Sequence, residues 1–598
     1  MTQLHRAPLM PPETPLKMPD QDLRRRFEDP KAGAAARAPW ALRAFAFALA
    51  GVLSAAIAGA FWTWFGDDVP MALRALVVLL VLATIFWIAL SPVLALIGLC
   101  TRPWRPGGKV RGLDVAVLVP VYGEAPEEIE RMLEAHLRSL SEHRSDHRFT
   151  VYVLSDTRDP KAVLRQRAMI AALRARHFDQ RLHYRHRANN TDFKTGNLRD
   201  WVTRWGGAHE AMLVLDADSY VPAQTMVALA DALDRRPQAG LIQTIPRLHE
   251  ATTIFGRMQQ FSTEIAGRIL GQGLGAVSRA EGNFWGHNAI LRTEAYAACA
   301  GLPHIQARVL GGVILSHDFV EAALLRRAGW EVRLLTEATE SFEQGPQTPV
   351  SHIVRDRRWC RGNLQHLRLI GAPGLAGMSR FHMIQGVMAY VSSVLWCALL
   401  VIWSTLGLSP VTDLTYFSAD APLFPVWPTA DLVSKLGVMG LVFGLLLAPR
   451  ILGAAVQVAN DPSLRGFGGP LRLALSLVIE TLLSVLVAPM MMVQHVRAVV
   501  TGFLGQGSGW RPHESTAPSL WDLMRFHWLE TVLGLVMIGS CAVGWITVWS
   551  LPIALSLAAT VPLSWVVGRP APEWLMRTPQ DQDVWSGGAP SLRPAPVR

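Results

Sequence analysis

The sequence has 598 residues, of which 50% are hydrophobic and only 17% are charged. Because an ordinary soluble domain is about 25% charged, this composition predicts a chain partly embedded in a membrane and excludes a disordered or collagen-like protein. The five cysteines are scattered without a CxxC pair, which excludes a disulfide framework and a zinc cluster. The net charge of +10 is assigned to loops beside membrane spans, since no basic groove with interleaved aromatic residues indicates a nucleic-acid partner.

The chain opens with a tail and two long apolar runs. Residues 1–39 contain a basic cluster and are expected to be a cytoplasmic tail without a core of its own. The runs over about 40–65 and 71–99 each exceed the ~20 residues that a helix needs to cross the hydrocarbon core. The first run is too long and too far from Met1 for a signal peptide, so two transmembrane helices are expected within residues 40–100.

Between residues 101 and 370 the apolar runs shrink to the length of strands and alternate with amphipathic helical patterns. The expected strands cover 114–123, 149–156, 181–187, 211–218 and 239–246, and the clearest helices cover 126–140 and 161–177. Strands and helices in alternation predict βαβ units and a mostly parallel sheet that is covered on both faces. The region is therefore expected to be a cytoplasmic α/β domain.

Beyond residue 370 the membrane pattern returns. Apolar spans are expected near 381–408, 433–456, 471–505, 526–547 and 549–567, within a transmembrane region over 371–568. The run over 471–505 is long for one crossing, and Pro489 inside it favours a broken or re-entrant hairpin. A basic tail over 569–598 favours the cytoplasm, so of seven or eight transmembrane helices we expect eight, which puts the central domain and both tails on one side.

Carboxylates follow the expected strands at the positions where an open α/β sheet binds its ligands. Asp216 and Asp218 end the strand over 211–218 and face the same side, so both can hold one Mg²⁺ or Mn²⁺ ion. An ordinary solvated turn is the alternative explanation. The buried strand before the pair, and Asp156 at the end of an earlier strand, favour the metal site.

Two further groups stand at the start of helical patterns. Lys194, with Gly196 and Asn197 behind it, is placed to bind phosphate at a helix N-terminus, although a plain helix start explains the same residues equally well. Asp318 and Glu321 begin a later helix, where acidic residues are common as caps. The functional alternative is that Asp318 is a general base for an attacking hydroxyl.

A dense cationic run covers residues 355–363. It contains Arg355, Arg358 and Arg361, whose guanidinium groups suit a diphosphate, and Trp359, whose ring suits the apolar face of a sugar. A basic surface beside the membrane is the ordinary explanation of such a run. Both properties in one cluster favour a nucleotide-sugar site.

In this order the motifs resemble those of the processive family-2 glycosyltransferases, the group that contains cellulose and hyaluronan synthases. The matching positions are Asp156, Lys194-Gly196-Asn197, Asp216-Ala217-Asp218, Asp318 and Arg358-Trp359. Two positions depart from the family pattern, because its TED triplet is Ser316-His317-Asp318 here and the Gln of QxxRW is Arg355. The segments HDFVEAALLRRAGWEV and RDRRWCRGNLQH resemble the glucan biosynthesis glucosyltransferase H branch, which makes osmoregulated periplasmic glucans in Gram-negative bacteria.

The resemblance implies a GT-A domain that uses UDP-glucose and inverts the anomeric carbon. On the donor side, Asp156 would contact the uridine and Lys194 the diphosphate. Asp216 and Asp218 would hold UDP and the metal, and Arg358 would face the diphosphate.

On the acceptor side, the resemblance implies that Asp318 is the general base and that Trp359 stacks on the acceptor sugar of a growing glucan chain. It further implies a β-1,2-linked backbone, a place in the bacterial inner membrane with membrane lipid around the helices, and acyl carrier protein and a periplasmic glucan-processing protein as partners. The membrane helices are expected to form an exit path. Gln457, Glu480 and Gln494 inside the spans would line a wet cavity or, equally well, bond between helices.

Three other functions stay open at this point. The chain could be another processive synthase of the cellulose or hyaluronan kind, or a non-processive glycosyltransferase that acts on a lipid carrier. The third alternative is a transporter or scaffold that has lost catalysis. Polymer, glycolipid or no product from labelled UDP-glucose would separate these outcomes.

Overall fold

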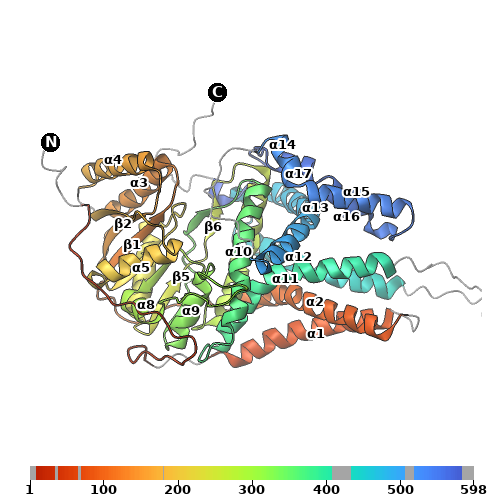
Figure 1. Cartoon of the computed structure of the whole chain (residues 1–598), viewed down its shortest axis with the longest axis horizontal. Helices are drawn as coiled ribbons and strands as arrows, with labels where there is room; N and C mark the ends of the chain where they lie inside the picture. Colours follow the sequence, from red (N-terminus) through yellow and green to blue (C-terminus); the bar gives the residue numbers. More distant parts are fainter. Residues whose placement is uncertain are drawn as a thin grey trace, which may run out of the picture.

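The computed structural model describes residues 9–33, 38–64, 69–178, 181–406, 432–505 and 518–581. Figure 1 shows an α/β domain with a set of long helices beside it, which extend from it in one direction. In the chain, this domain lies between α2 (Met71–Cys100) and α11 (Gly377–Leu406).

Seven strands form the central sheet in the order β3-β2-β1-β4-β7-β5-β8. They are β1 (Asp114–Val121), β2 (Arg148–Ser155), β3 (Arg181–His186), β4 (Ala211–Val214), β5 (Ala239–Gln243), β7 (Ala289–Arg292) and β8 (Glu331–Leu334), and β6 (Arg247–His249) pairs with β9 (Phe342–Gln344) in a second sheet. Only β7 runs antiparallel to its neighbours β4 and β5 among these described strands. The prediction of a mostly parallel sheet is confirmed.

Helices cover both faces of the sheet, as the alternation of strands and helices predicted. Val115, Val117 and Val119 of β1 pack with α3 (Pro126–Glu142), α4 (Pro160–Arg176) and α6 (Ala223–Arg235). Ala116 and Leu118 point to the other face, toward α5 (Phe193–Trp205), α8 (Thr293–Cys299) and α9 (His317–Arg327). Successive strand residues face opposite sides, so a strand buried on both faces must be apolar throughout.

The N-terminal segment over 9–33 runs along the α5, α8 and α9 side of the domain. Leu9 accepts a hydrogen bond from the backbone of Tyr184 at the edge strand β3, 2.9 Å long. Further along, the carboxylate of Asp29 accepts a 3.0 Å hydrogen bond from the Trp330 indole. The segment therefore packs on the sheet domain before the chain enters α1 (Trp40–Trp64).

Long helices extend from the domain. α1 packs with α2, α11 packs on α2, and α12 (Leu432–Asn460) packs on α2 and α7 (Ile254–Ser278). α15 (Trp528–Ala542) forms a hairpin with the bent pair α16 (Leu551–Ala558) and α17 (Thr560–Val567). The turn of this hairpin reaches the far end of α11, where Thr547 donates a 3.0 Å backbone hydrogen bond to Ser404. Trp545 and Trp549 on this turn are 73% and 81% exposed, as expected for aromatic residues at a membrane–water interface.

Within the described ranges, five helices are long and apolar enough to cross a membrane, or six if the bent pair counts as one span. The shorter α15 brings the apolar segments to seven, the lower of the two counts expected. The chain is therefore a polytopic membrane protein.

The hairpin expected within 471–505 is wrong. α13 (Pro470–Phe503) is one continuous helix of 34 residues, with Pro489 inside it. Leu473 near its start packs with Phe255 of α7 (Ile254–Ser278), and Gly502 at its end packs against Leu364 of α10 (Pro349–Leu369).

Both ends of α13, about 50 Å apart, thus contact helices of the sheet domain. By length and composition α13 is one of the five candidate spans, so residues 471–505 supply one candidate span where the pattern favoured a hairpin. The C-terminal segment returns to α7, where Arg569 accepts a backbone hydrogen bond from Ile254, and the part of the expected tail over 582–598 lies outside the described residues.

Candidate active site

The site begins where β4 ends, at the edge of the sheet that carries the carboxyl ends of the parallel strands. Asp216 and Asp218 follow this strand and are partly exposed. Burial raises the pKa of Asp218 to about 7, and the neighbouring charge of Asp216 adds to the effect. Burial acts on Asp216 in the same direction, but the positive charges of Lys194, His287 and Arg358 together outweigh it, and the pKa of Asp216 is lowered.

Lys194 reaches this pair from the start of α5. Its ammonium forms an ion pair with the Asp216 carboxylate and donates a 2.9 Å hydrogen bond to the carbonyl of Gly286. The turn before it is held by Gly196, where a side chain would collide with the carbonyl of Thr191. Asn197 is buried and donates a 3.0 Å hydrogen bond to Leu154 of β2. Of these three residues, all expected to bind substrate, Lys194 contacts the strand-end acid Asp216, while Gly196 and Asn197 fix the helix to the sheet.

Asp318 lies at the start of α9, on the other side of Gly286. Gly286 has φ +92°, and a side chain added there would contact the Asp318 carboxylate at 3.5 Å. Burial raises the pKa of Asp318, and His317 opposes this effect. The backbone at Gly286 therefore lies between Asp318 and the Lys194–Asp216 ion pair, and brings residues from three distant parts of the chain together.

His287 and Glu343 belong to the site but were not predicted from the sequence. Their side chains form a 3.0 Å ion pair between the start of β7 and β9. Burial alone would lower the pKa of His287, but Glu343 raises it to about 9. Glu343 also contributes to the raised pKa of Asp218. The one local signal for this segment in the sequence was Gly286, which stands shortly before the short strand β7.

α10 presents one face of its cationic run to the cleft. Arg355, Arg358, Trp359 and Gly362 recur at the spacing of a single helix face, and Gly362 packs tightly against Ser316. Burial lowers the pKa of Arg358, an effect that Asp216 and Asp318 both oppose. Trp359 is 42% exposed, and the Arg355 guanidinium lies 4.3 Å from the centre of its ring.

Arg361 lies on the other face of α10. Its neighbour one turn earlier, Arg357, donates a 2.6 Å hydrogen bond to Gln494 of α13, and the backbone of Arg361 packs against Gly502 of the same helix. The structure therefore separates Arg361 from the cleft residues Arg358 and Trp359.

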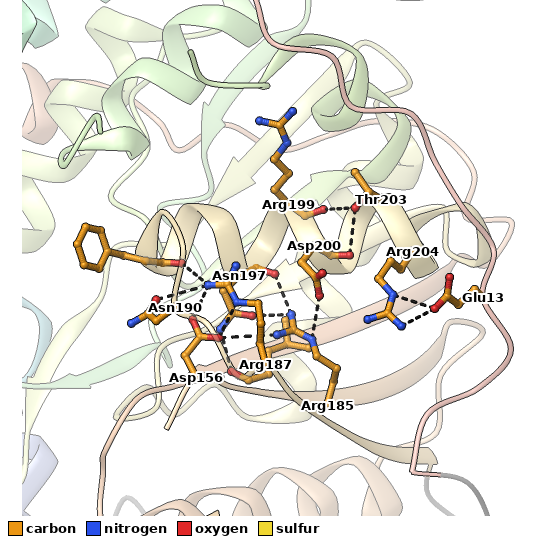
Figure 2. Close-up of polar contacts among 12 residues, drawn as sticks. Glu13, Asp156, Arg185, Arg187, Asn190, Asn197, Arg199, Asp200, Thr203 and Arg204 are labelled. Atoms are coloured by element: carbon orange, nitrogen blue, oxygen red, sulfur yellow. Dashed lines mark hydrogen bonds and ion pairs between the residues drawn. The ribbon is translucent and has the colours of Figure 1, made fainter. Parts of the chain in front are cut away.

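Asp156 lies at the same edge of the sheet, at the end of β2, but inside a network of arginines. Figure 2 shows its carboxylate facing Arg187, which donates two hydrogen bonds of 2.9 and 2.7 Å. Arg185 lies 3.8 Å from it and also bonds Asn197. The Asp156 side chain is 3% exposed. The structure thus joins Asp156 to α5 through arginines, while Lys194, Asp216, Asp318 and Arg358 form the cleft.

The carboxylate pair fits a divalent ion that takes its other ligands from a diphosphate. Among the described residues, no group of three or more histidine, cysteine or acidic side chains could hold a metal ion. Asp216 and Asp218 offer oxygen atoms only, which Mg²⁺ and Mn²⁺ prefer, and these ions are commonly bound by one or two carboxylates plus phosphate oxygens. Burial and the negative charges of Asp216 and Glu343 raise the pKa of Asp218, and a bound cation would offset these effects.

Known proteins resemble the chain over nearly its whole length. The family model described as glycosyl transferase family 2 matches residues 116–299, and the one described as glycosyl transferase family group 2 matches residues 211–432. A Vibrio cholerae protein named glucans biosynthesis glucosyltransferase H is 39% identical, over 94% of this chain and 80% of its own. A Rhodopseudomonas palustris protein of the same name is 38% identical, over 97% and 82%.

One solved structure is a more distant match. A mannosyltransferase from Pyrobaculum calidifontis, in complex with GDP-Man and Mn²⁺, is 18% identical with a TM-score of 0.41, over 65% of this chain and 99% of its own.

Proposed function

The chain belongs to the glucans biosynthesis glucosyltransferase H family within glycosyl transferase family 2, and from this premise we propose that it transfers glucose from UDP-glucose to a growing glucan with inversion at the anomeric carbon. It is a hexosyltransferase in a membrane, and its sheet domain is the GT-A domain. The observation that carries the proposal is the cluster of contacts in which Lys194 bridges Asp216 and the Gly286 carbonyl beside Asp318. This arrangement supplies cations for a departing diphosphate and a carboxylate for an incoming hydroxyl.

On the donor side, Lys194 and Arg358 hold the diphosphate as its charge develops. Lys194 is a flexible point charge, so it can leave Asp216 and move to a phosphate oxygen when the nucleotide enters. Asp216 and Asp218 would hold Mg²⁺ or Mn²⁺, which supplies positive charge that stabilises the leaving UDP. Asp156 is proposed to contact the uridine, which requires Arg187 to share or release its carboxylate.

On the acceptor side, Asp318 takes the proton from the attacking hydroxyl, which approaches the face of the anomeric carbon opposite UDP. A carboxyl whose pKa burial has raised is a stronger base than a solvated one once it is ionised. Trp359 offers its ring to the acceptor sugar, and Arg355 covers part of that ring. Positioning and fixed charges supply most of the acceleration in such a displacement.

Export of the product is the second part of the proposal, because a polar glucan cannot cross hydrocarbon unaided. α10, which carries Trp359, packs against the membrane helix α11 through Leu364 and Val387, so synthesis and entry into a passage would take place close together. Two polar residues expected to line a passage have protein partners, since Arg450 bonds Glu480 and Arg357 bonds Gln494. They support helix packing in preference to a wet wall.

The family resemblance carries the remaining parts of the proposal. They are a β-1,2 glucan backbone, the bacterial inner membrane with the catalytic domain in the cytoplasm, and acyl carrier protein and a periplasmic glucan-processing protein as partners.

Labelled UDP-glucose supplied to purified membranes tests the reaction, and the product is identified by linkage analysis. We expect a glucose polymer from the wild-type chain. The Asp318→Asn variant should lose turnover by about 10²–10⁴-fold while it still binds UDP, because a general base contributes to the chemical step and not to nucleotide affinity. Turnover that survives this substitution, or a glycolipid product, would contradict the proposal.

A further inference from the structure

The segment that carries Asp318 is fixed from two sides. On one side α10 packs against it: His366 bonds the carbonyl of Ser316 at 3.2 Å, and the side chain of Gln365 accepts a 2.9 Å hydrogen bond from the backbone of Leu315. On the other side, α9 begins at once and turns His317 into the domain. A residue in this position has little freedom to move, so its contacts define its role.

His317 and Glu321 form a histidine–carboxylate pair one helical turn apart. The Nδ1 atom of His317 lies 3.1 Å from Glu321 Oε1, and the Glu321 side chain is 0% exposed. The hydroxyl of Tyr296 on α8 donates a 2.8 Å hydrogen bond to the same oxygen. Glu321 Oε2 is buried and has no hydrogen-bond partner within the described chain. A buried carboxylate with this few donors needs a neighbouring positive charge, which His317 can supply.

Among the charged groups around Asp318, His317 is the one that most favours its ionised carboxylate. Glu321, on the same helix, and burial both favour the protonated carboxyl. Lys194 from α5 and Arg358 from α10 lie near enough to act on Asp318, but both also act on Asp216. Of the cations that act on Asp318, His317 has the largest effect, and Glu321 and Asp318 both raise the pKa of His317.

We propose that His317 is a positioning residue of the catalytic centre, an imidazolium held by buried Glu321 that keeps the Asp318 carboxylate ionised and ready for the acceptor hydroxyl. The inference rests on the proposed role of Asp318 as general base. It also accounts for the departure from the family pattern at this position. In the TED triplet an acidic residue precedes the aspartate. Here His317 stands at that position, and the acidic residue Glu321 lies one helical turn later.

The test is the pH dependence of kcat/KM for UDP-glucose, measured on the full-length protein in membranes. In the His317→Gln variant the acidic limb should move to higher pH by about one unit, because a close opposite charge lowers a carboxyl pKa by at least that much. At a pH below the limb the rate should fall about tenfold, and at alkaline pH the variant and wild type should converge. UDP affinity should stay unchanged. An unmoved limb, or a rate reduced equally at every pH, would overturn the inference.

Two further variants keep the test decisive. His317→Asn is a second neutral replacement and must move the limb in the same direction if the first variant does not fold, with UDP binding as the check on folding. Tyr296→Phe removes a hydrogen bond from the same Glu321 oxygen without changing any charge, so it should lower thermal stability and leave the limb in place. Failure of the proposed function is recognised separately, since Asp318→Asn would then stay active whatever His317 does.

Discussion

The ends of strands β2 and β4 have the same sequence pattern and opposite surroundings. Each is a buried apolar strand followed by aspartate, and both strands are neighbours of β1. Asp156 after β2 is held by the two-pronged guanidinium of Arg187, whereas Asp216 after β4 is held by the single ammonium of Lys194. The planar guanidinium of arginine binds a carboxylate through two hydrogen bonds and holds it in place. The lysine ammonium is a flexible point charge, so the carboxylate can change partners. The comparison teaches that the cation beside a strand-end acid, more than the acid itself, decides whether the carboxylate stays in a fixed network or can exchange its partner for a ligand.

We call the end of β4, where Lys194 holds Asp216, the open site. Removing its acid, Asp216, should have the largest effect on activity. The Asp216→Asn variant should lose turnover by about 10³-fold, because it removes a metal ligand and the partner that holds Lys194 in the cleft. Incorporation of labelled glucose measures the loss. Thermal unfolding should change little, since a lysine near solvent remains solvated without its partner. A large loss of stability with activity retained would place Asp216 with the structural sites.

We call the end of β2, where Arg187 holds Asp156, the closed site. Removing its acid, Asp156, should lower the stability of the folded protein. The Asp156→Asn variant leaves the buried Arg187 guanidinium without its carboxylate and Arg185 with Asp200 alone, which costs about 3 kcal/mol of unfolding free energy. Denaturant unfolding followed by tryptophan fluorescence measures this cost.

Glu13→Gln is the matched control for that variant. Glu13 also pairs with an arginine of the same region, Arg204, but both side chains are about half exposed (Figure 2). We expect a change of about 0.5 kcal/mol or less for such a pair. Equal effects of the two variants would mean that burial of the Asp156 network contributes nothing.

The sequence predicted the elements that have strong local patterns. β1, β2 and β5 are largely apolar runs between turns, β3 alternates apolar with polar residues, and the structure has all four within a few residues of the predicted bounds. β7 was missed because three apolar residues and an arginine before a helix are too short a pattern, and its antiparallel direction depends on contacts with β4 and β5. The hairpin expected in α13 was wrong because apolar length and a proline do not tell whether a helix is broken or continuous.

The site was predictable to the same extent. The spacing of Asp216 and Asp218 follows from strand geometry, so their pairing could be predicted without coordinates. The partner of Asp156 depends on the order of strands, because Arg187 follows β3, which pairs with β2. The His287–Glu343 pair joins residues from β7 and β9 that share no helix, strand or motif. Such long-range pairs follow from the sheet topology, which local patterns do not contain.

The smallest expected effect concerns Asp218 at the open site, where a proton competes with a divalent ion for the carboxylate. Asp218 has a pKa of about 7 in the folded protein, above the ordinary value of a carboxyl group. The folded protein therefore binds a proton that the unfolded chain does not, and without a divalent ion its stability should rise as the pH falls from 8 toward 5. A divalent ion needs the ionised carboxylate, so its affinity should fall by about tenfold for each pH unit below 7.

Melting temperatures measured with and without Mn²⁺ and UDP test this pH dependence. The stabilisation by the ion and nucleotide should be larger at pH 8 than at pH 6, because protonation of Asp218 removes one of the two oxygen ligands. The Asp218→Asn variant should lose the pH dependence. Asp156→Asn should keep it even where its affinity for UDP falls, since the Asp156 carboxylate bonds Arg187 and is not a proposed metal ligand. A pH dependence that follows Asp156 in place of Asp218 would reverse the assignment of open and closed sites, because the proton would then compete at the end of β2.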